Sequence, residues 1–189
     1  MSPAVDETAY LDAARESIVA VGWRRTTLTD IARRAGVSRM TIYRRWPDTR
    51  SLLADLLVRE WSALVDAAGV RDDGPGSTRE RLARGVTAMV AALRGNALWL
   101  RIVELDPELL VPYLFDRRGR NQKGAVDLVS AQIGAGQADG SVRPGDPTVL
   151  AESLLLATYG FLLSAHTTDV AAATLDAELA ALVERYLRP

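Results

Sequence analysis

The amino-acid sequence predicts an all-α fold, in which a small three-helix domain over residues 1–50 precedes a larger helical domain over residues 51–189. Apolar residues recur at spacings of three and four along most of the chain, which is the period of an amphipathic helix. Glycine, proline and capping residues interrupt this pattern where helices are expected to end. No segment shows the alternation of apolar and polar residues, bounded by turn residues, that is typical of a β-hairpin.

The first two predicted helices are separated by a glycine turn. One helix runs over about residues 7–21 and ends at Gly22, a residue suited to the left-handed conformation of a helix cap. The next helix begins after Thr27, a favourable N-cap, and Asp30 three positions later makes a variant of the capping box. Gly36 ends this second, short helix.

The third helix is also short. Ser38 is its expected N-cap, and Val37 and Ile42 have the spacing of a hydrophobic staple across that cap. Pro47 closes the helix, because a proline disfavours the helical conformation of the residue before it. Asp48 is then the expected N-cap of a long, leucine-rich fourth helix.

The rest of the chain contains further helices joined by polar turns. Residues 71–77 are rich in glycine, aspartate and proline and predict a loop. Glu104, Asp106 and Glu108 surround Pro107, a pattern that fits a cation site or, as we favour, a capped helix start. The later helices are expected at about residues 78–93, 97–105, 107–115, 121–137, 147–166 and 173–187.

The composition argues against several classes of protein. The chain has no cysteine and one histidine, His166, which leaves no thiolate chemistry and little imidazole chemistry. We therefore expect no enzyme activity, no cofactor and no metal site. No stretch approaches the roughly 18 uncharged apolar residues that span a bilayer. The first ten residues lack the basic and apolar parts of a secretion signal, so we expect a cytoplasmic protein with no membrane partner.

The formal net charge of −1 hides a basic N-terminal segment. Between Gly22 and Arg50 the chain has eight arginines against two aspartates, a net charge of +6. Residues 51–189 have 14 basic and 18 acidic residues, a net charge of −4. A basic head on an acidic body indicates that a polyanion binds at one end.

The second and third helices form a candidate helix-turn-helix. On a helical wheel, Ile42 and Trp46 share the face that packs inward, whereas Met40 and Arg44 lie on the opposite face. Arg39 lies in the first turn, where a helix inserted in the major groove meets base edges. The alternative is an ordinary helical hairpin with a solvated arginine face. The local charge of +6 favours DNA binding.

The run from Gly22 to Trp46, GWRRTTLTDIARRAGVSRMTIYRRW, closely resembles the N-terminal domain of the TetR family of bacterial transcriptional regulators. The resemblance covers about residues 7–57, roughly a quarter of the chain, and the motif is highly specific. It implies that the third helix is a recognition helix for DNA. The residues that it implies in DNA binding are Thr27, Ser38, Arg39, Met40, Thr41, Tyr43, Arg44, Arg45, Thr49 and Arg50.

The resemblance also implies individual roles. Thr27 and Tyr43 would contact the DNA backbone, and the groove-facing residues would be Arg39, Met40, Thr41 and Arg44. Two positions depart from the family pattern. Trp46 stands where the family usually has phenylalanine, which preserves an aromatic plug. Thr49 stands where many members have a phosphate-binding lysine, so Arg50 or nearby backbone N–H groups would replace that contact.

The larger domain is implied to sense a small molecule and to dimerise. Large or polar-tipped side chains on its helices are candidate ligand contacts, although for any single one a core position is the favoured explanation. These candidates are Trp61, Met89, Trp99, Ile102, Tyr113, Phe115, Tyr159 and Phe161. The last two helices have apolar stripes that predict a four-helix interface with a second copy. The stripe residues are Leu150, Leu154, Ala157, Phe161, Leu175, Leu179, Leu182 and Tyr186.

These features together predict a homodimeric repressor that binds a palindromic operator in double-stranded DNA and is released by a small-molecule effector. One alternative is a helical small-molecule-binding protein or enzyme that retains a helix-turn-helix domain, which turnover of a ligand would reveal. Another is an activator or a nucleoid-type DNA binder. Absence of any operator preference would favour the nucleoid type.

Overall fold

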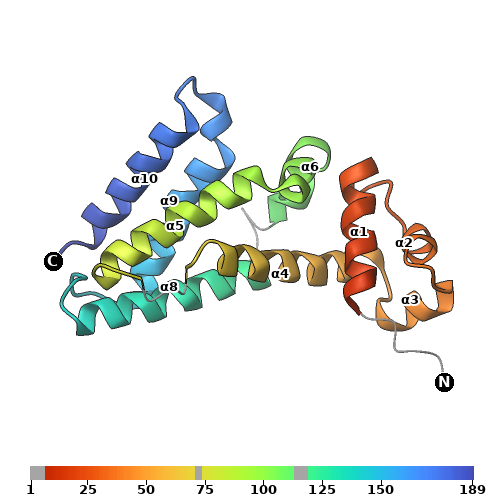
Figure 1. Ribbon diagram of the computed structural model, residues 1–189, viewed down its shortest axis with the longest axis horizontal. Coiled ribbons are helices and arrows are strands. Elements are labelled where there is room, and N and C mark those ends of the chain that lie inside the picture. Colours follow the sequence, from red (N-terminus) through yellow and green to blue (C-terminus); the bar gives the residue numbers. More distant parts are fainter. Residues whose placement is uncertain (1–6, 71–73, 113–118) are drawn as a thin grey trace. The chain divides into compact units, whose positions relative to one another are not determined.

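The computed structural model describes residues 7–70, 74–112 and 119–189. Over these ranges the protein is all-α and has no strand, which confirms the predicted fold class (Figure 1). No single helix within them is both long and apolar enough to cross a membrane. The helices Thr78–Gly95 and Ala97–Leu105 reach that length and apolar character only when taken together, and they are bent by 62° at the break between them. The α-helices of the described ranges are α1 Glu7–Val21, α2 Leu28–Arg34, α3 Arg39–Arg45, α4 Thr49–Ala67, α5 Thr78–Gly95, α6 Ala97–Leu105, α8 Arg120–Ala138, α9 Pro147–Leu163 and α10 Ala172–Leu187. Two 3-10 helices are η1 Pro107–Leu109 and η2 Ala165–Thr167.

Two of the expected helices have different ends in the structure. The helix expected over residues 107–115 starts as η1, and its last three residues lie outside the described residues. The helix expected over residues 147–166 ends at Leu163 and is followed by η2. The hydroxyl groups of Thr167 and Thr168 donate to the carbonyls of Ser164 and Ala165, three residues earlier. These bonds satisfy carbonyls that the end of the α-helix would leave without a partner.

The helices pack as two compact units. The first unit comprises residues 1–61 and 96–118, and the second comprises residues 62–95 and 119–189. Helix α4 therefore contributes residues to both units, and α6 with η1 packs with the N-terminal helices although it lies far along the chain. The functional division at residue 50 stays a prediction, because packing and function need not divide the chain at the same place.

Trp46 is the central side chain of the first unit's hydrophobic core. It is 1% exposed and meets Tyr10 edge-on, with ring centroids 5.7 Å apart. Its indole N–H donates to the Asp55 carboxylate over 2.8 Å, so the polar tip of the ring is satisfied. The other buried members of this core are Leu11, Ala13, Ala14, Ile18, Leu28, Ile31, Ala32, Ile42, Leu52, Leu53, Leu56, Leu98 and Ile102.

Helix α6 holds the C-terminal end of α1. Arg101 donates from Nε to the carbonyl of Val19 at 2.9 Å and from Nη2 to the carbonyl of Ala20 at 3.3 Å. These carbonyls belong to the last turn of α1, where no backbone N–H of the same helix is available to them. A cation at this position also faces the negative end of the helix dipole.

Asp106, at the end of α6, binds the turn that follows α1. Its carboxylate is 1% exposed and accepts the backbone N–H groups of Trp23 at 2.7 Å and Arg24 at 3.3 Å. The preceding Gly22 has φ +83°, and a Cβ there would lie 3.0 Å from Leu105. A helix does start at Pro107 as expected, with Asp106 at the N-cap position of η1 and its backbone carbonyl accepting the Leu109 N–H at 3.0 Å. The Asp106 side chain makes no cap bond to η1 and satisfies the distant turn instead.

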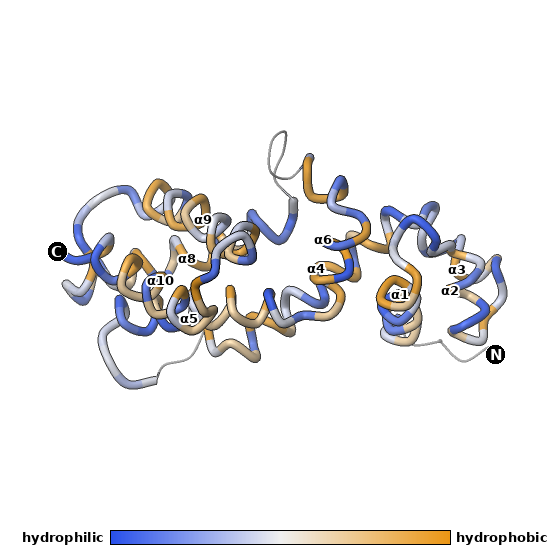
Figure 2. Tube along the Cα trace, turned by 90° about the horizontal axis from the view of Figure 1, so that it is seen from above, coloured by the Kyte–Doolittle hydropathy of each residue, from blue (hydrophilic) through white to orange (hydrophobic). Residues whose placement is uncertain are grey.

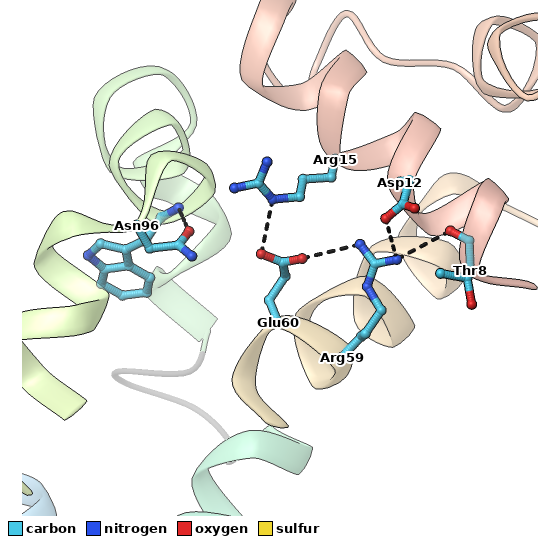
Figure 3. A network of polar contacts seen from close by, with 7 residues as sticks. Thr8, Asp12, Arg15, Arg59, Glu60 and Asn96 are labelled. Carbon is cyan, nitrogen blue, oxygen red and sulfur yellow. Dashed lines mark hydrogen bonds and ion pairs between the residues drawn. The ribbon is translucent and has the colours of Figure 1, made fainter. Parts of the chain in front are cut away.

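A network of ion pairs joins α4 to α1 (Figure 3). Arg59 donates to Asp12 at 2.7 Å and to the carbonyl of Thr8 at 3.3 Å. Glu60 lies between Arg59, at 3.2 Å, and Arg15, at 3.1 Å. Glu60 is the least exposed of these side chains, at 17%, so its two cationic partners compensate a largely desolvated charge.

The second unit has its own core between α5, α8, α9 and α10. Its C-terminal end is fixed by Arg143, whose N–H and guanidinium donate to the carbonyls of Leu187 and Tyr186. Arg94 of α5 and Asp176 of α10 form an ion pair that links those two helices. The buried members of this core are Leu82, Ala83, Val90, Val126, Ile133, Val142, Leu150, Ala151, Leu154, Leu179, Val183 and Leu187.

Asp139 connects the end of α8 to the start of α5. Its carboxylate accepts the Thr78 hydroxyl at 2.6 Å and the Ser141 backbone N–H at 2.8 Å. Hydrogen bonds from Ser141 and then Thr78 lower the pKa of Asp139 from 3.8 to about 2, because they favour the charged form.

We expect Asp106→Asn to lower the free energy of unfolding by about 1–3 kcal/mol, since an amide presents one acceptor and leaves a buried backbone N–H facing its own donor. The matched control is Glu108→Gln. Glu108 pairs with Arg24 at the surface, with side-chain exposures of 45% and 69%, so its loss should leave stability unchanged. Urea titration followed by circular dichroism measures both. Equal effects of the two substitutions would show that the buried contact carries no special stability.

We expect the stability contributed by Asp139 to be fully present above about pH 4 and to be lost as the pH falls toward 2. The reason is that the pKa is lower in the folded chain, about 2, than its ordinary value of 3.8. Thermal melts of the wild type and Asp139→Asn between pH 2 and 7 test this. The difference between their Tm values should be constant near neutral pH and shrink below pH 4. Parallel profiles down to pH 2 would contradict the assignment.

Candidate nucleic-acid interface

The turn between α2 and α3 is set by Gly36. Its φ is +70°, and a Cβ there would meet no atom within 4 Å, so the backbone conformation rather than space requires glycine. The Gly36 N–H donates to the Arg33 carbonyl at 3.2 Å, and the Val37 N–H donates to the Ala32 carbonyl at 2.9 Å. This pair of bonds is the Schellman motif, which fixes the direction in which the chain leaves α2.

Both helices of the motif have the N-caps that the sequence predicts. Thr27 accepts the Asp30 N–H at 3.1 Å, and its hydroxyl donates to the Asp30 carboxylate at 2.6 Å. In a full capping box the Asp30 carboxylate would accept the backbone N–H of Thr27. Here it accepts the Thr27 hydroxyl instead. Ser38 accepts the Thr41 N–H at 3.2 Å, and the two hydroxyls lie 2.8 Å apart.

One side of α3 is buried and the other is exposed. Ile42 is 0% exposed and the following Trp46 is 1% exposed, so they anchor the helix in the first unit's core as expected. Met40 is 79% exposed and Tyr43 is 42% exposed. An open depression of about 390 Å³ on this side is lined by Met40, Thr41, Tyr43 and Arg44. Three of the four predicted groove-facing side chains, Met40, Thr41 and Arg44, therefore line one depression, together with the predicted backbone contact Tyr43.

The arginines near this surface differ in how they are paired. Arg39 and Arg44 are exposed and form no ion pair in the ranges that the structure describes, although Arg39 lies 6.0 Å from the Tyr43 ring centre. Arg45 is different: it pairs with Glu7 of α1 at 2.9 Å and lies over the Trp46 ring at 5.2 Å. Within α3, the guanidinium groups left for a polyanion are therefore those of Arg39 and Arg44.

The start of α4 lies next to this surface in the sequence. Asp48 accepts the Ser51 N–H at 2.7 Å, as its predicted capping role requires, and this bond lowers the pKa of the Asp48 carboxyl. Arg50 is exposed, whereas Thr49 is half-buried. Arg50 and the nearby backbone N–H groups are the two proposed substitutes for a phosphate-binding lysine. Arg50 is the one with an exposed positive charge.

Similarity to known proteins decides the family. The family model described as bacterial regulatory proteins, tetR family, matches residues 11–56. An uncharacterized HTH-type transcriptional regulator from Mycobacterium bovis is 37% identical over 179 residues, which are 94% of this chain and 92% of that one.

The chain belongs to the TetR family of transcriptional regulators. Its fold matches that of solved TetR-type proteins over nearly the whole length. The FadR regulator of Bacillus subtilis, solved with stearoyl-CoA, aligns with a TM-score of 0.71 at 17% identity, covering 96% of this chain and 99% of that one. The QsdR repressor of R. erythropolis aligns with a TM-score of 0.69 at 16% identity, covering 96% and 93%. The first unit thus contains a TetR-type helix-turn-helix.

The predicted ligand contacts of this TetR-family chain are divided between the two units, and as a ligand site they stay a prediction. Trp61, Trp99 and Ile102 belong to the first unit. Met89, Tyr159 and Phe161 belong to the second. Tyr113 and Phe115 lie outside the described residues. Ile102 is 2% exposed and packs in the first unit's core with α1, which favours a structural role for it.

The predicted dimer contacts divide in the same way. Leu150, Leu154 and Leu179 are buried in the second unit's own core, so the structure corrects their assignment to an intermolecular surface. The other predicted contacts, Ala157, Phe161, Leu175, Leu182 and Tyr186, are exposed or half-buried. Sequence analysis missed Val149 and Leu156, which are 58% and 64% exposed on α9. The signal was the high share of apolar residues along α9 (Figure 2), which left some of them exposed after the core was filled.

Proposed function

We propose that this protein is a transcriptional repressor that binds a palindromic operator as a homodimer and is released from it by a small-molecule effector. The observation that carries the proposal is the outer face of α3, where Arg39 and Arg44 stand exposed without carboxylate partners while Ile42 and Trp46 fix the helix from below. As a regulator of genes, it acts on DNA in the cytoplasm.

The side chains on that face fit the chemistry of the major groove. An arginine donates two parallel hydrogen bonds to the O6 and N7 atoms of guanine, which makes Arg44 a base-reading residue. The Tyr43 hydroxyl donates to a phosphate, as does the exposed Arg50, and these contacts position the helix without reading sequence. Arg45 is paired with Glu7 at the surface, so we expect it to contribute less to DNA binding than Arg44 does.

A two-fold dimer accounts for the remaining apolar surface. Leu156 and Val149 are seven residues apart on α9, and both are more than half exposed. Ala157 of α9 and Leu182 of the neighbouring α10 are exposed as well. Burial of this surface against its symmetry mate forms a four-helix interface and pairs two recognition helices with two half-sites.

Release by an effector requires only a modest energetic difference. A 100-fold loss of operator affinity corresponds to about 2.7 kcal/mol of coupling between effector and DNA. Two helices carry the signal in this proposal: α4, which contributes to both units, and α6, which follows the second unit's α5 and holds the α1–α2 turn through Asp106. The FadR structure with stearoyl-CoA supports a ligand-responsive body for this fold.

The test of DNA recognition begins with selection of duplexes from a random-sequence library by the full-length protein. We expect a palindrome to emerge. Arg44→Ala should change which bases are preferred, because it removes a base contact. Tyr43→Phe should weaken binding about fivefold on all sequences alike, because it removes one hydrogen bond to phosphate. Arg45→Ala is the control, and it should leave base preference unchanged. Identical behaviour of Arg44→Ala and Tyr43→Phe across operator variants would refute the groove assignment.

The test of dimerisation is Leu156→Glu, which places a carboxylate in the centre of the proposed interface. We expect the dimer dissociation constant, measured by analytical ultracentrifugation, to rise at least about 100-fold, because two unpaired charges would be buried. Leu100→Glu, at a side chain 51% exposed on α6 of the first unit, is the control and should leave the dimer intact. A wild-type chain that sediments as a monomer at micromolar concentration would end the dimer proposal.

A further inference from the structure

Met40 has the largest exposed fraction of any large apolar side chain in the described residues, at 79%. It lies in the first turn of α3 between the exposed Arg39 and Thr41, and it forms one wall of the depression that also includes Arg44. An unbranched thioether at this position adds nothing to the head's core. It instead gives an otherwise cationic and polar surface one apolar contact point.

The DNA major groove offers one apolar group to such a contact. Adenine, guanine and cytosine present hydrogen-bond donors and acceptors there, whereas thymine presents its C5-methyl group as well. The flexible methionine side chain adapts to a small apolar partner better than a branched side chain does. We propose that Met40 recognises the C5-methyl group of a thymine in each operator half-site. This inference rests on the proposed operator binding and adds a specificity-determining contact to it.

The helix geometry also places this thymine relative to the base that Arg44 contacts. Met40 and Arg44 are four residues apart on the same face of α3, so their Cα atoms are separated by about 6 Å along the helix axis. Successive base pairs are about 3.4 Å apart along DNA. The thymine read by Met40 therefore lies within about two base pairs of the guanine contacted by Arg44. Both groups then face the depression that these two side chains line.

The experiment replaces single thymines of the selected duplex with deoxyuridine, which keeps the hydrogen-bonding edge and lacks only the methyl group. One thymine in each half-site should respond, with a loss of affinity of about fourfold per half-site, the contribution of one buried methyl group. Met40→Ala should bind the parent duplex more weakly and should not distinguish thymine from deoxyuridine at that position. Because Met40 is exposed, this variant should melt at the wild-type temperature.

A matched variant separates Met40 from its neighbour. Thr41→Ser removes the other side-chain methyl group that lines the depression and keeps the hydroxyl that bonds Ser38, so it should retain the discrimination against deoxyuridine. The inference is overturned if no thymine responds while the parent duplex still binds, or if Met40→Ala still discriminates, or if Thr41→Ser alone abolishes the effect. A wild-type protein that selects no duplex at all would instead refute the proposed function, and this inference with it.

Discussion

The buried carboxylate of Asp106 is the contact on which the geometry of the DNA-binding unit depends. The turn after α1 exposes backbone N–H groups that neither α1 nor α2 can satisfy, and Asp106 accepts two of them from 82 and 83 residues away. Inside the same turn the Thr26 hydroxyl donates to the Gly22 carbonyl at 2.8 Å and lies 3.3 Å from the Ser17 hydroxyl. Because buried polar groups must be paired, these hydrogen bonds fix the direction in which the chain enters α2. The position of α3 follows, since a short turn joins it to α2.

The consequence is that α6 is part of the DNA-binding unit rather than of the second unit, whose helix α5 precedes it in the chain. Arg101 and Asp106 attach it to the end of α1 at two points, and Leu98 and Ile102 place its apolar side in the same core as Trp46. Asn96 caps this helix by accepting the Trp99 N–H at 3.0 Å, only one residue after α5 ends. Within the proposed function, a displacement of α5 has a short covalent route to the turn that orients the recognition helix.

Structural features that depend on a few neighbouring residues could be predicted from the sequence. The N-caps Thr27 and Ser38 and the left-handed Gly22 and Gly36 each depend on a few consecutive residues, and all four are present as expected. The role of Asp106 was not predictable, because its partner lies more than eighty residues away and aspartate before proline is also a common helix start. The apolar α9 was ambiguous for another reason. A helix that is apolar on all sides has no periodic signal to distinguish the core-facing leucines from the exposed Val149 and Leu156.

The net charge of residues 22–50 is another property that local sequence does not predict well, because some of the arginines pair with carboxylates from elsewhere in the chain. Of the eight arginines between residues 22 and 50, Arg24, Arg33, Arg34 and Arg45 pair with carboxylates of the head itself. Two of those carboxylates, Glu7 and Glu16, precede the basic segment on α1, and Glu108 follows it by more than fifty residues, so a local sum of charge omits all three. The arginines with no ion pair in the described ranges are Arg25, Arg39, Arg44 and Arg50. The paired arginines are engaged by the head's own carboxylates, whereas two of the unpaired ones share the outer face of α3 with Met40. The capacity of this head to bind and read DNA therefore follows from which side chains its own folding leaves unpaired, and the net charge of the segment overstates it.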